Sequence, residues 1–148
     1  SSSSISDGAA AVVLMGADTA AANGIAPLAR VVAQATHSHE PEWFTTAPIG
    51  AIEKVLAKAG WNVADVDLFE INEAFAVVAM APIRKLGIDH AKVNVNGGAC
   101  ALGHPIGASG ARLVVTLVNA LRSRGLRRGV ASLCIGGGEA TAIAIELI

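Results

Sequence analysis

Apolar and polar positions along the chain predict five strands. Residues 9–15 form one continuous apolar run, as expected of a strand covered on both faces, and residues 28–35 contain adjacent valines that favour a strand. Residues 67–71 predict a short strand that ends at a polar residue. Residues 130–135 and 140–148 flank three consecutive glycines, which predicts an antiparallel hairpin at one edge of a sheet.

The segments between these strands contain helical signatures. One helix covers residues 46–60, between a capping threonine and a terminating glycine, and another covers residues 73–86, where a proline produces a kink. Leucines four residues apart predict a long helix through residues 113–121. After the first strand, Asp18 or Thr19 can cap a short helix.

The composition is that of one folded domain. The 148 residues are 53% apolar and 16% charged, which is enough for a sizeable core. Sixteen glycines and only three phenylalanines favour backbones packed closely in layers of sheet and helix. Because no repeat and no Pro-rich or Gly-rich linker divides the chain, we expect a single α/β domain over residues 1–148.

Charge and cysteine content exclude several classes of function. A formal net charge of −1 leaves no broad basic field that could bind nucleic acid or an anionic bilayer. No apolar stretch approaches the roughly 20 residues that span a membrane, so no membrane partner is expected. Cys100 and Cys134 predict free thiols in a reducing, cytoplasmic compartment rather than a disulfide framework.

Three reactive side chains lie where a predicted strand or loop meets a helix or a glycine-rich turn. Asn72 follows the strand at residues 67–71, His104 lies in a glycine-rich segment, and Cys134 lies near the end of an apolar strand. Ends of strands and helices are where binding and catalytic groups gather in layered folds. We expect the three side chains to converge on one pocket.

His104 combines a titratable ring with a rigid backbone. Gly103 and Gly107 permit a sharp turn and a close approach to a ligand, and Pro105 stiffens the position. An imidazole held in this way can transfer protons near neutral pH. The competing interpretation is a structural histidine in a loop.

Cys134 and Asn72 each allow two interpretations. The Cys134 thiol precedes three glycines, so it would lie at an exposed strand end with free backbone N–H groups nearby, which suits a base. The alternative is a buried and inert cysteine. The Asn72 carboxamide could hold a water molecule or could cap the following helix. Cys100 occupies a position where small packing residues are usual, and we expect it to be structural.

Three sequence blocks together resemble the thiolase family. They are Asn72-Glu73-Ala74-Phe75-Ala76, the glycine-rich segment 96–110, and Cys134-Ile135-Gly136-Gly137-Gly138, and residues 7–15 extend the resemblance to the start of the chain. It covers residues 1–148, but only the carboxyl-terminal half of a thiolase. The fold implied by the resemblance is α/β, a layered half with a mixed, mostly five-stranded sheet and helices on both faces.

The resemblance also assigns roles to individual residues. His104 would activate the nucleophilic cysteine and help to bind the thioester oxygen, while Cys134 would exchange a proton with the alpha carbon of acetyl-CoA. Asn72 would hold the water of one oxyanion hole, and the N–H of Gly136 would belong to a second. The substrate-binding positions implied in the same way are Ser3, Phe75 and Gly103.

The activity implied by the resemblance is that of an acyl-CoA acetyltransferase: Claisen condensation of acetyl-CoA to acetoacetyl-CoA, or the reverse thiolysis. The expected substrates are acetyl-CoA and other acyl-CoA thioesters, no metal or organic cofactor is implied, and the complete enzyme is expected to be a homo-oligomer. A ketoacyl synthase shares the layered fold by resemblance, but Cys134 before three glycines argues against it.

Nothing in the chain matches the motif of the nucleophilic cysteine, which lies in the family's amino-terminal half. That missing half is therefore an expected partner, and this chain alone is expected to be inactive. The alternative function is a non-catalytic assembly or scaffold domain. Activity that appears only when the two halves are mixed would distinguish a split catalyst from a scaffold.

Two polar clusters outside these blocks have plainer interpretations. The histidines and acids of the loop at residues 37–46 lack the spacing of a preformed metal site, which favours a solvated loop. The four arginines within residues 122–128 lie near the end of the long helix, where cations offset the negative pole of its dipole. Phosphate binding is the second interpretation for these arginines.

Overall fold

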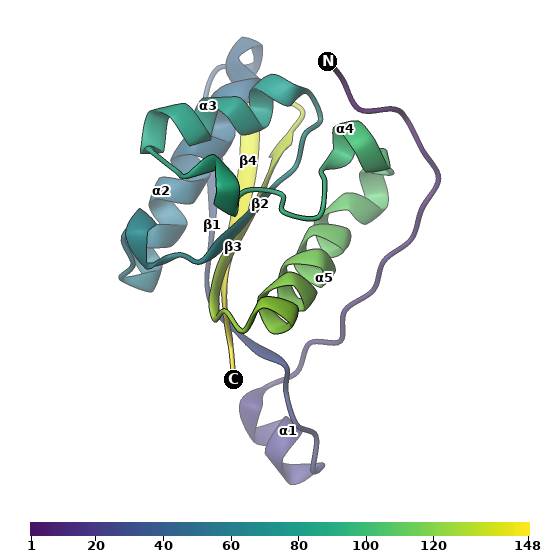
Figure 1. Ribbon diagram of the computed structural model, residues 1–148, viewed down its shortest axis with the longest axis vertical. Helices are drawn as coiled ribbons and strands as arrows, with labels where there is room; N and C mark the ends of the chain where they lie inside the picture. Colours follow the sequence, from purple (N-terminus) through teal and green to yellow (C-terminus); the bar gives the residue numbers. More distant parts are fainter.

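A computed structural model describes residues 1–148 and shows a mixed four-stranded sheet with helices on both faces (Figure 1). The strands lie in the spatial order β1-β4-β3-β2. β2 runs parallel to β3, whereas β4 is antiparallel to both of its neighbours. Their bounds are β1 Ala29–Ser38, β2 Leu68–Ile71, β3 Arg128–Ile135 and β4 Glu139–Leu147.

Three of the helices lie within about three residues of the predicted ones, α5 is longer than the predicted segment 113–121, and the short helix α4 was not predicted. Their bounds are α1 Ala17–Ala22, α2 Ala47–Ala59, α3 Ala76–Leu86, α4 Ala99–Leu102 and α5 Ile106–Arg124, with 3-10 turns at Pro41–Thr46, Val63–Asp65 and His90–Lys92. The predicted loop at 37–46 begins as the end of β1 and continues as the first of these turns. None of the helices is long and apolar enough to cross a membrane.

The prediction of a strand at residues 9–15 is wrong, and the sheet consequently has four strands instead of five. The segment runs outside α5 toward α1 without joining the sheet (Figure 1). Val13 and Leu14 are 85% and 75% exposed. A strand needs the N–H and C=O groups of a neighbouring strand, and no strand of this chain lies beside the segment.

The glycine hairpin lies in the middle of the sheet and not at its edge. β3 pairs with β4 across the turn, as predicted, but β4 also pairs with β1 and β3 also pairs with β2. The four strands therefore form one continuous ladder. The hairpin's burial follows from the small and aliphatic residues of its strands, which can be covered on both faces; β4, for example, contains three alanines and two isoleucines.

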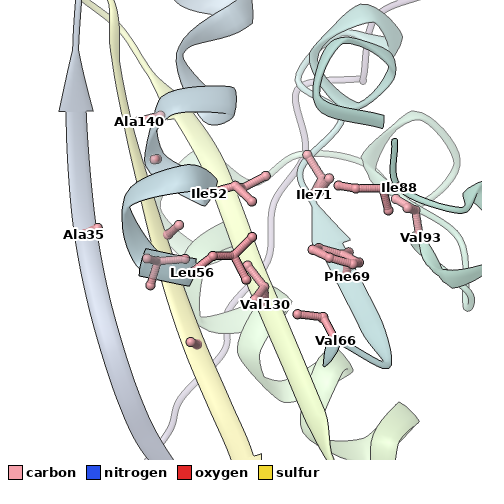
Figure 2. Close-up of a cluster of buried hydrophobic side chains, with 14 of the residues drawn as sticks. Ala35, Ile52, Leu56, Val66, Phe69, Ile71, Ile88, Val93, Val130 and Ala140 are labelled. Atoms are coloured by element: carbon pink, nitrogen blue, oxygen red, sulfur yellow. The ribbon is translucent and has the colours of Figure 1, made fainter. Parts of the chain in front are cut away.

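Two apolar cores lie on opposite faces of this sheet. On one face α2 contributes Ile52 and Leu56, which pack with Phe69 and Val130 (Figure 2). On the other face the predicted leucine row of α5 is buried with Leu68. Because successive residues of a strand point to opposite faces, even-numbered residues of β2 face α5. The same alternation directs Glu70 and Asn72, at the carboxyl end of β2, toward α5.

The loop after β2 remains extended for longer than predicted. α3 starts at Ala76, because Phe75 keeps an extended backbone (φ −130°, ψ 151°) and forms a β-bridge with Ser2 near the start of the chain. Ser3 N–H donates to the Ala74 carbonyl (3.1 Å), and Ala76 N–H donates to the Ser1 carbonyl (3.0 Å). The amino-terminal strand-like contact takes the place of the first helical turn.

Candidate functional site

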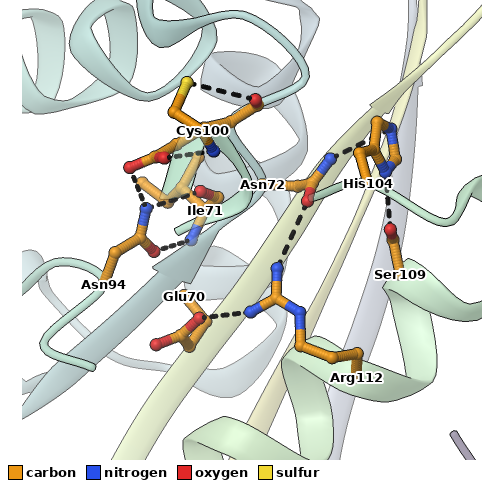
Figure 3. Close-up of polar contacts among 9 residues, drawn as sticks. Glu70, Ile71, Asn72, Asn94, Cys100, His104, Ser109 and Arg112 are labelled. Carbon is orange, nitrogen blue, oxygen red and sulfur yellow. Dashed lines mark hydrogen bonds and ion pairs between the residues drawn. The ribbon is translucent and has the colours of Figure 1, made fainter. Parts of the chain in front are cut away.

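Asn72 lies at the carboxyl end of β2, where the parallel pairing with β3 fixes its position. Its backbone N–H donates to the Ser132 carbonyl (2.9 Å), which continues the β2–β3 ladder by one residue. The residue is only 1% exposed, and its side chain projects toward α5 (Figure 3). The carboxamide is therefore held by the sheet and presented at its end.

His104 meets Asn72 from the opposite side of this site. The His104 Nε2 atom lies 3.3 Å from Asn72 Nδ2, and its Nδ1 is hydrogen-bonded to Ser109 Oγ (Figure 3). The backbone N–H of His104 donates to the Ser4 carbonyl (2.9 Å). Burial, with a further contribution from the positive charge of Arg112, lowers the pKa of His104. The ring is neutral at pH 7 and can accept a proton.

Gly103 makes the turn before His104 possible. Its φ is +95°, which disfavours any residue with a Cβ, and an added Cβ would overlap Ser6 Oγ. The amino-terminal segment passes directly over this turn, and Ile5 forms a bridge to His104. A hollow of about 360 Å³ next to it is lined by residues 6–10 and 105–108.

Cys134 lies at the same end of the sheet but reaches it from the other face. It is two residues beyond Ser132 in β3, or about 7 Å at the usual strand rise of about 3.3 Å per residue. Leu133 belongs to the core beneath α5, so strand alternation directs Cys134 to the α2 face. Burial raises the pKa of the Cys134 thiol.

The structure thus brings Asn72 and His104 into direct contact, and no hydrogen bond joins Cys134 to either of them. Gly136 follows Cys134 at the exposed tip of the hairpin, and a Cβ there would meet nothing within 4 Å. The end of the sheet leaves this tip open to a ligand or to another chain. Convergence of all three side chains on one pocket stays a prediction.

Ser3 and Phe75 lie together beside Asn72. The Ser3 hydroxyl donates to the Ala74 carbonyl (3.0 Å), which ties the start of the chain to the loop after β2. Phe75 is 42% exposed and meets Phe44 edge to face, with 6.1 Å between ring centroids. The two residues therefore border the site without contacting His104 through a hydrogen bond.

Two charged residues that the sequence analysis did not single out complete the polar network. Arg112 Nη1 lies 3.2 Å from Glu70 Oε2, and Arg112 Nη2 donates to Asn72 Oδ1 (3.4 Å) (Figure 3). Glu70 is 1% exposed, and burial raises its pKa to about 7, against the opposing effect of Arg112. The sequence did contain a signal for this network. Glu70 is a carboxylate inside an otherwise apolar strand, and it lies two residues before Asn72, which puts both side chains on the same face.

Glu73 orders the neighbouring loop. Its Oε1 accepts from Asn94 Nδ2 (3.0 Å) and its Oε2 accepts from the Cys100 N–H (3.0 Å). A Cβ on Gly98 would collide with this carboxylate, so the glycine permits the close approach. Partial desolvation raises the pKa of the Cys100 thiol although the residue is exposed, and the neighbouring Glu73 carboxylate adds to the shift. The structural role of Cys100 stays a prediction.

The two clusters outside the site have ordinary structural partners. His37 and His39 meet edge to face, with 5.2 Å between ring centroids, and nowhere do three or more His, Cys, Asp or Glu side chains gather as metal ligands would. Arg127 and Arg128 lie 3.4 Å and 3.1 Å from Glu146 Oε1. These two arginines therefore form ion pairs with a carboxylate of β4, whereas the sequence analysis assigned them to the negative end of the α5 dipole.

Comparisons with known proteins agree on one family. The family described as "Thiolase, C-terminal domain" matches residues 25–147. A protein of Dictyostelium discoideum named "Probable acetyl-CoA acetyltransferase" is 54% identical over 144 residues, which cover 97% of this chain and 35% of that protein. The cytosolic acetyl-CoA acetyltransferase of Mus musculus is 52% identical, with coverage of 97% and 36%.

Solved structures give the same result. The crystal structure of the Bacillus anthracis acetyl-CoA acetyltransferase matches 90% of this chain and 34% of its own, with a TM-score of 0.88 and 46% identity. Human mitochondrial 3-ketoacyl-CoA thiolase matches 89% of this chain and 33% of its own, with a TM-score of 0.86 and 44% identity. The chain spans about a third of the length of the curated relatives that it matches.

Proposed function

Because the chain belongs to the thiolase family, we propose that it supplies one part of an active site that transfers acetyl groups between acyl-CoA thioesters. The reaction is Claisen condensation of acetyl-CoA to acetoacetyl-CoA or the reverse thiolysis. The observation that carries the proposal is the hydrogen bond between Asn72 and His104, which places a neutral imidazole at the open end of the sheet. The substrate class is that of the relatives, which are named acetyl-CoA acetyltransferases.

In this proposal His104 first acts as a base. Its lowered pKa leaves a ring nitrogen free to take the proton of a nucleophilic cysteine supplied by another part of the enzyme. The cysteine thiolate then attacks the thioester carbonyl, and CoA leaves as its thiol. Once protonated, His104 can donate with Asn72, directly or through water, to the oxygen that becomes negative in the transition state.

Cys134 acts in the second half-reaction. A pKa raised by burial keeps its thiol protonated at neutral pH, which suits delivery of a proton to the alpha carbon during thiolysis. In condensation the thiolate form of the same side chain removes the alpha proton and becomes the thiol again. The N–H of Gly136 contributes to an oxyanion hole beside it, and Ser3, Phe75 and Gly103 line the approach of the substrate.

The expected partners follow from what the chain lacks. No cysteine here resembles the family's nucleophile, so we infer that an amino-terminal thiolase half completes the site. From the family resemblance we also propose that the complete enzyme is a homo-oligomer. The reaction requires no metal or organic cofactor. The two free thiols favour a cytoplasmic location, and one relative is named cytosolic.

Exchange of the alpha protons of acetyl-CoA into deuterated water tests the proposal. The purified chain is assayed alone and after mixing with an amino-terminal thiolase half, and exchange is expected only in the mixture. Cys134→Ala should abolish it, because the base is lost, while Cys100→Ala should leave it within about twofold, because that thiol is exposed and takes no part in the proposed chemistry. Exchange that persists in Cys134→Ala would remove this residue as the base.

A non-catalytic assembly domain is the second candidate, and one observation favours it. The pKa values of both thiols are raised, so neither cysteine of the chain is an activated nucleophile. This candidate predicts that the mixture forms a complex but shows neither proton exchange nor thiolysis. Size-exclusion chromatography on the same mixture distinguishes an inactive complex from two halves that never meet.

A further inference from the structure

The Asn72 carboxamide faces two different partners at once. Its Nδ2 lies 3.3 Å from His104 Nε2, and its Oδ1 accepts from Arg112 Nη2 at 3.4 Å. The two ends of an amide are similar in size, but one end donates hydrogen bonds and the other accepts them. A guanidinium group can only donate. Arg112 therefore selects the oxygen of Asn72 and turns its NH2 group toward the imidazole.

This orientation decides where the proton of His104 resides. A ring nitrogen that accepts from an NH2 group carries no proton, so Nε2 presents its lone pair to Asn72. The proton is on Nδ1, which donates to Ser109 Oγ, and the Ser109 hydroxyl donates to the Pro105 carbonyl (3.1 Å). Every hydrogen bond from Arg112 to Pro105 then runs in one consistent direction.

Glu70 holds the guanidinium group in place. Its Oε2 accepts from Arg112 Nη1 at 3.2 Å, while its Oε1 is buried without a partner. A buried carboxyl group with an unpaired oxygen stabilises a fold less than an apolar side chain of the same size would. Packing alone therefore gives no reason for a carboxylate in β2, whereas orientation of Arg112 does.

We propose that Arg112, anchored by Glu70, is a positioning residue that fixes the orientation of Asn72 and thereby keeps His104 in its Nδ1-protonated tautomer. Arg112 lies outside the three sequence blocks and acts on the imidazole only through the amide. The inference rests on the proposed function, because this tautomer is the one whose Nε2 can accept a proton from a nucleophile.

The tautomer can be measured in the chain as it exists. With 15N-labelled histidine, long-range proton–nitrogen spectra at pH 8 distinguish a protonated from an unprotonated ring nitrogen, and His104→Gln assigns the signals. The wild-type ring is expected to carry its proton on Nδ1. In Arg112→Leu the Nε2-protonated form should rise severalfold, because nothing then prevents rotation of the Asn72 amide.

Arg122→Leu is the matched control, because it removes an exposed guanidinium group from the same helix. Its His104 signals should equal those of the wild type. Arg112→Leu alone leaves Glu70 buried without a cation and could unfold the chain. The double variant Glu70→Gln/Arg112→Leu removes both buried charges, keeps the shape of residue 70, and still leaves the amide free to rotate.

A wild-type tautomer ratio in a folded double variant overturns the proposal. A shifted ratio with unchanged signals from His37, His39 and His90 supports it, because general loosening of the fold would move those rings as well. The readout is the protonation of one ring in the isolated chain, so it does not depend on acetyl transfer. A failure of the proposed function and a failure of this inference are therefore separate results.

Discussion

At the scale of the residue, Glu70 links stability to pH. Its pKa is raised to about 7 in the folded chain from an ordinary value of 4.5, chiefly by burial. Between these two pH values the folded state binds a proton that the unfolded state has already released. The free energy of unfolding therefore falls as the pH rises through this window, which is the reverse of the usual behaviour of a paired carboxylate.

Glu70→Gln should remove this contribution. We expect the stability of the variant relative to wild type to increase by about 2 kcal/mol between pH 5 and pH 7.5, since one pKa unit corresponds to about 1.4 kcal/mol. Urea unfolding at the two pH values measures the difference. Glu139→Gln, at an exposed carboxyl group, serves as the control. Parallel pH profiles for wild type and Glu70→Gln would contradict the assigned role of burial.

At the scale of the element, α2 ends where a single glycine adopts a left-handed backbone. Gly60 has φ +69°, and its backbone N–H donates back into the helix, to the Ala57 carbonyl (3.2 Å). No atom lies within 4 Å of an added Cβ, so a substitution there meets no steric contact. Any loss of stability must come from the backbone conformation itself.

Gly60→Ala should therefore destabilise the chain by about 1 kcal/mol, although alanine would contact nothing. Gly107→Ala is the matched comparison, because the space around that glycine is equally open while its backbone is helical. It should be neutral or slightly stabilising, by up to about 1 kcal/mol. Urea unfolding of both variants provides the comparison, and equal losses would point to side-chain crowding that the structure does not contain.

At the scale of the whole molecule, the first 24 residues contribute little to the core but much to the site. Of these residues only Ala20 is buried, and the family match begins at residue 25. The serines at the start nevertheless accept hydrogen bonds from the backbones of Ala76 and His104. The segment thus covers the site without supporting the sheet.

Removal of residues 1–24 should leave the sheet folded and loosen the site. We expect amide hydrogen exchange at Ala76 and His104 to accelerate at least tenfold, because each N–H loses its carbonyl acceptor. Amides within the β3–β4 hairpin should keep their protection. Uniformly faster exchange, measured by NMR, would instead mean that the segment stabilises the entire domain.

The sequence by itself determined the local elements and the family. Leucines spaced by four residues produced α5, Gly60 ended α2, and three glycines joined β3 to β4. These features depend on backbone conformation and on side chains close in sequence, which a pattern records directly. The blocks around Asn72 and His104 identified the family for the same reason, since each is a short continuous segment.

Only the tertiary structure decided which groups meet. The apolar run at residues 9–15 indicates that this segment favours burial, but a strand forms only where a neighbouring strand offers hydrogen bonds. Arg112 and Glu70 are 42 residues apart in sequence, and their ion pair exists because α5 packs against β2. Periodicity records which face a residue occupies. The packing of distant elements decides which partner a residue meets on that face. It thereby also decides the pKa of Glu70 and the orientation of Asn72.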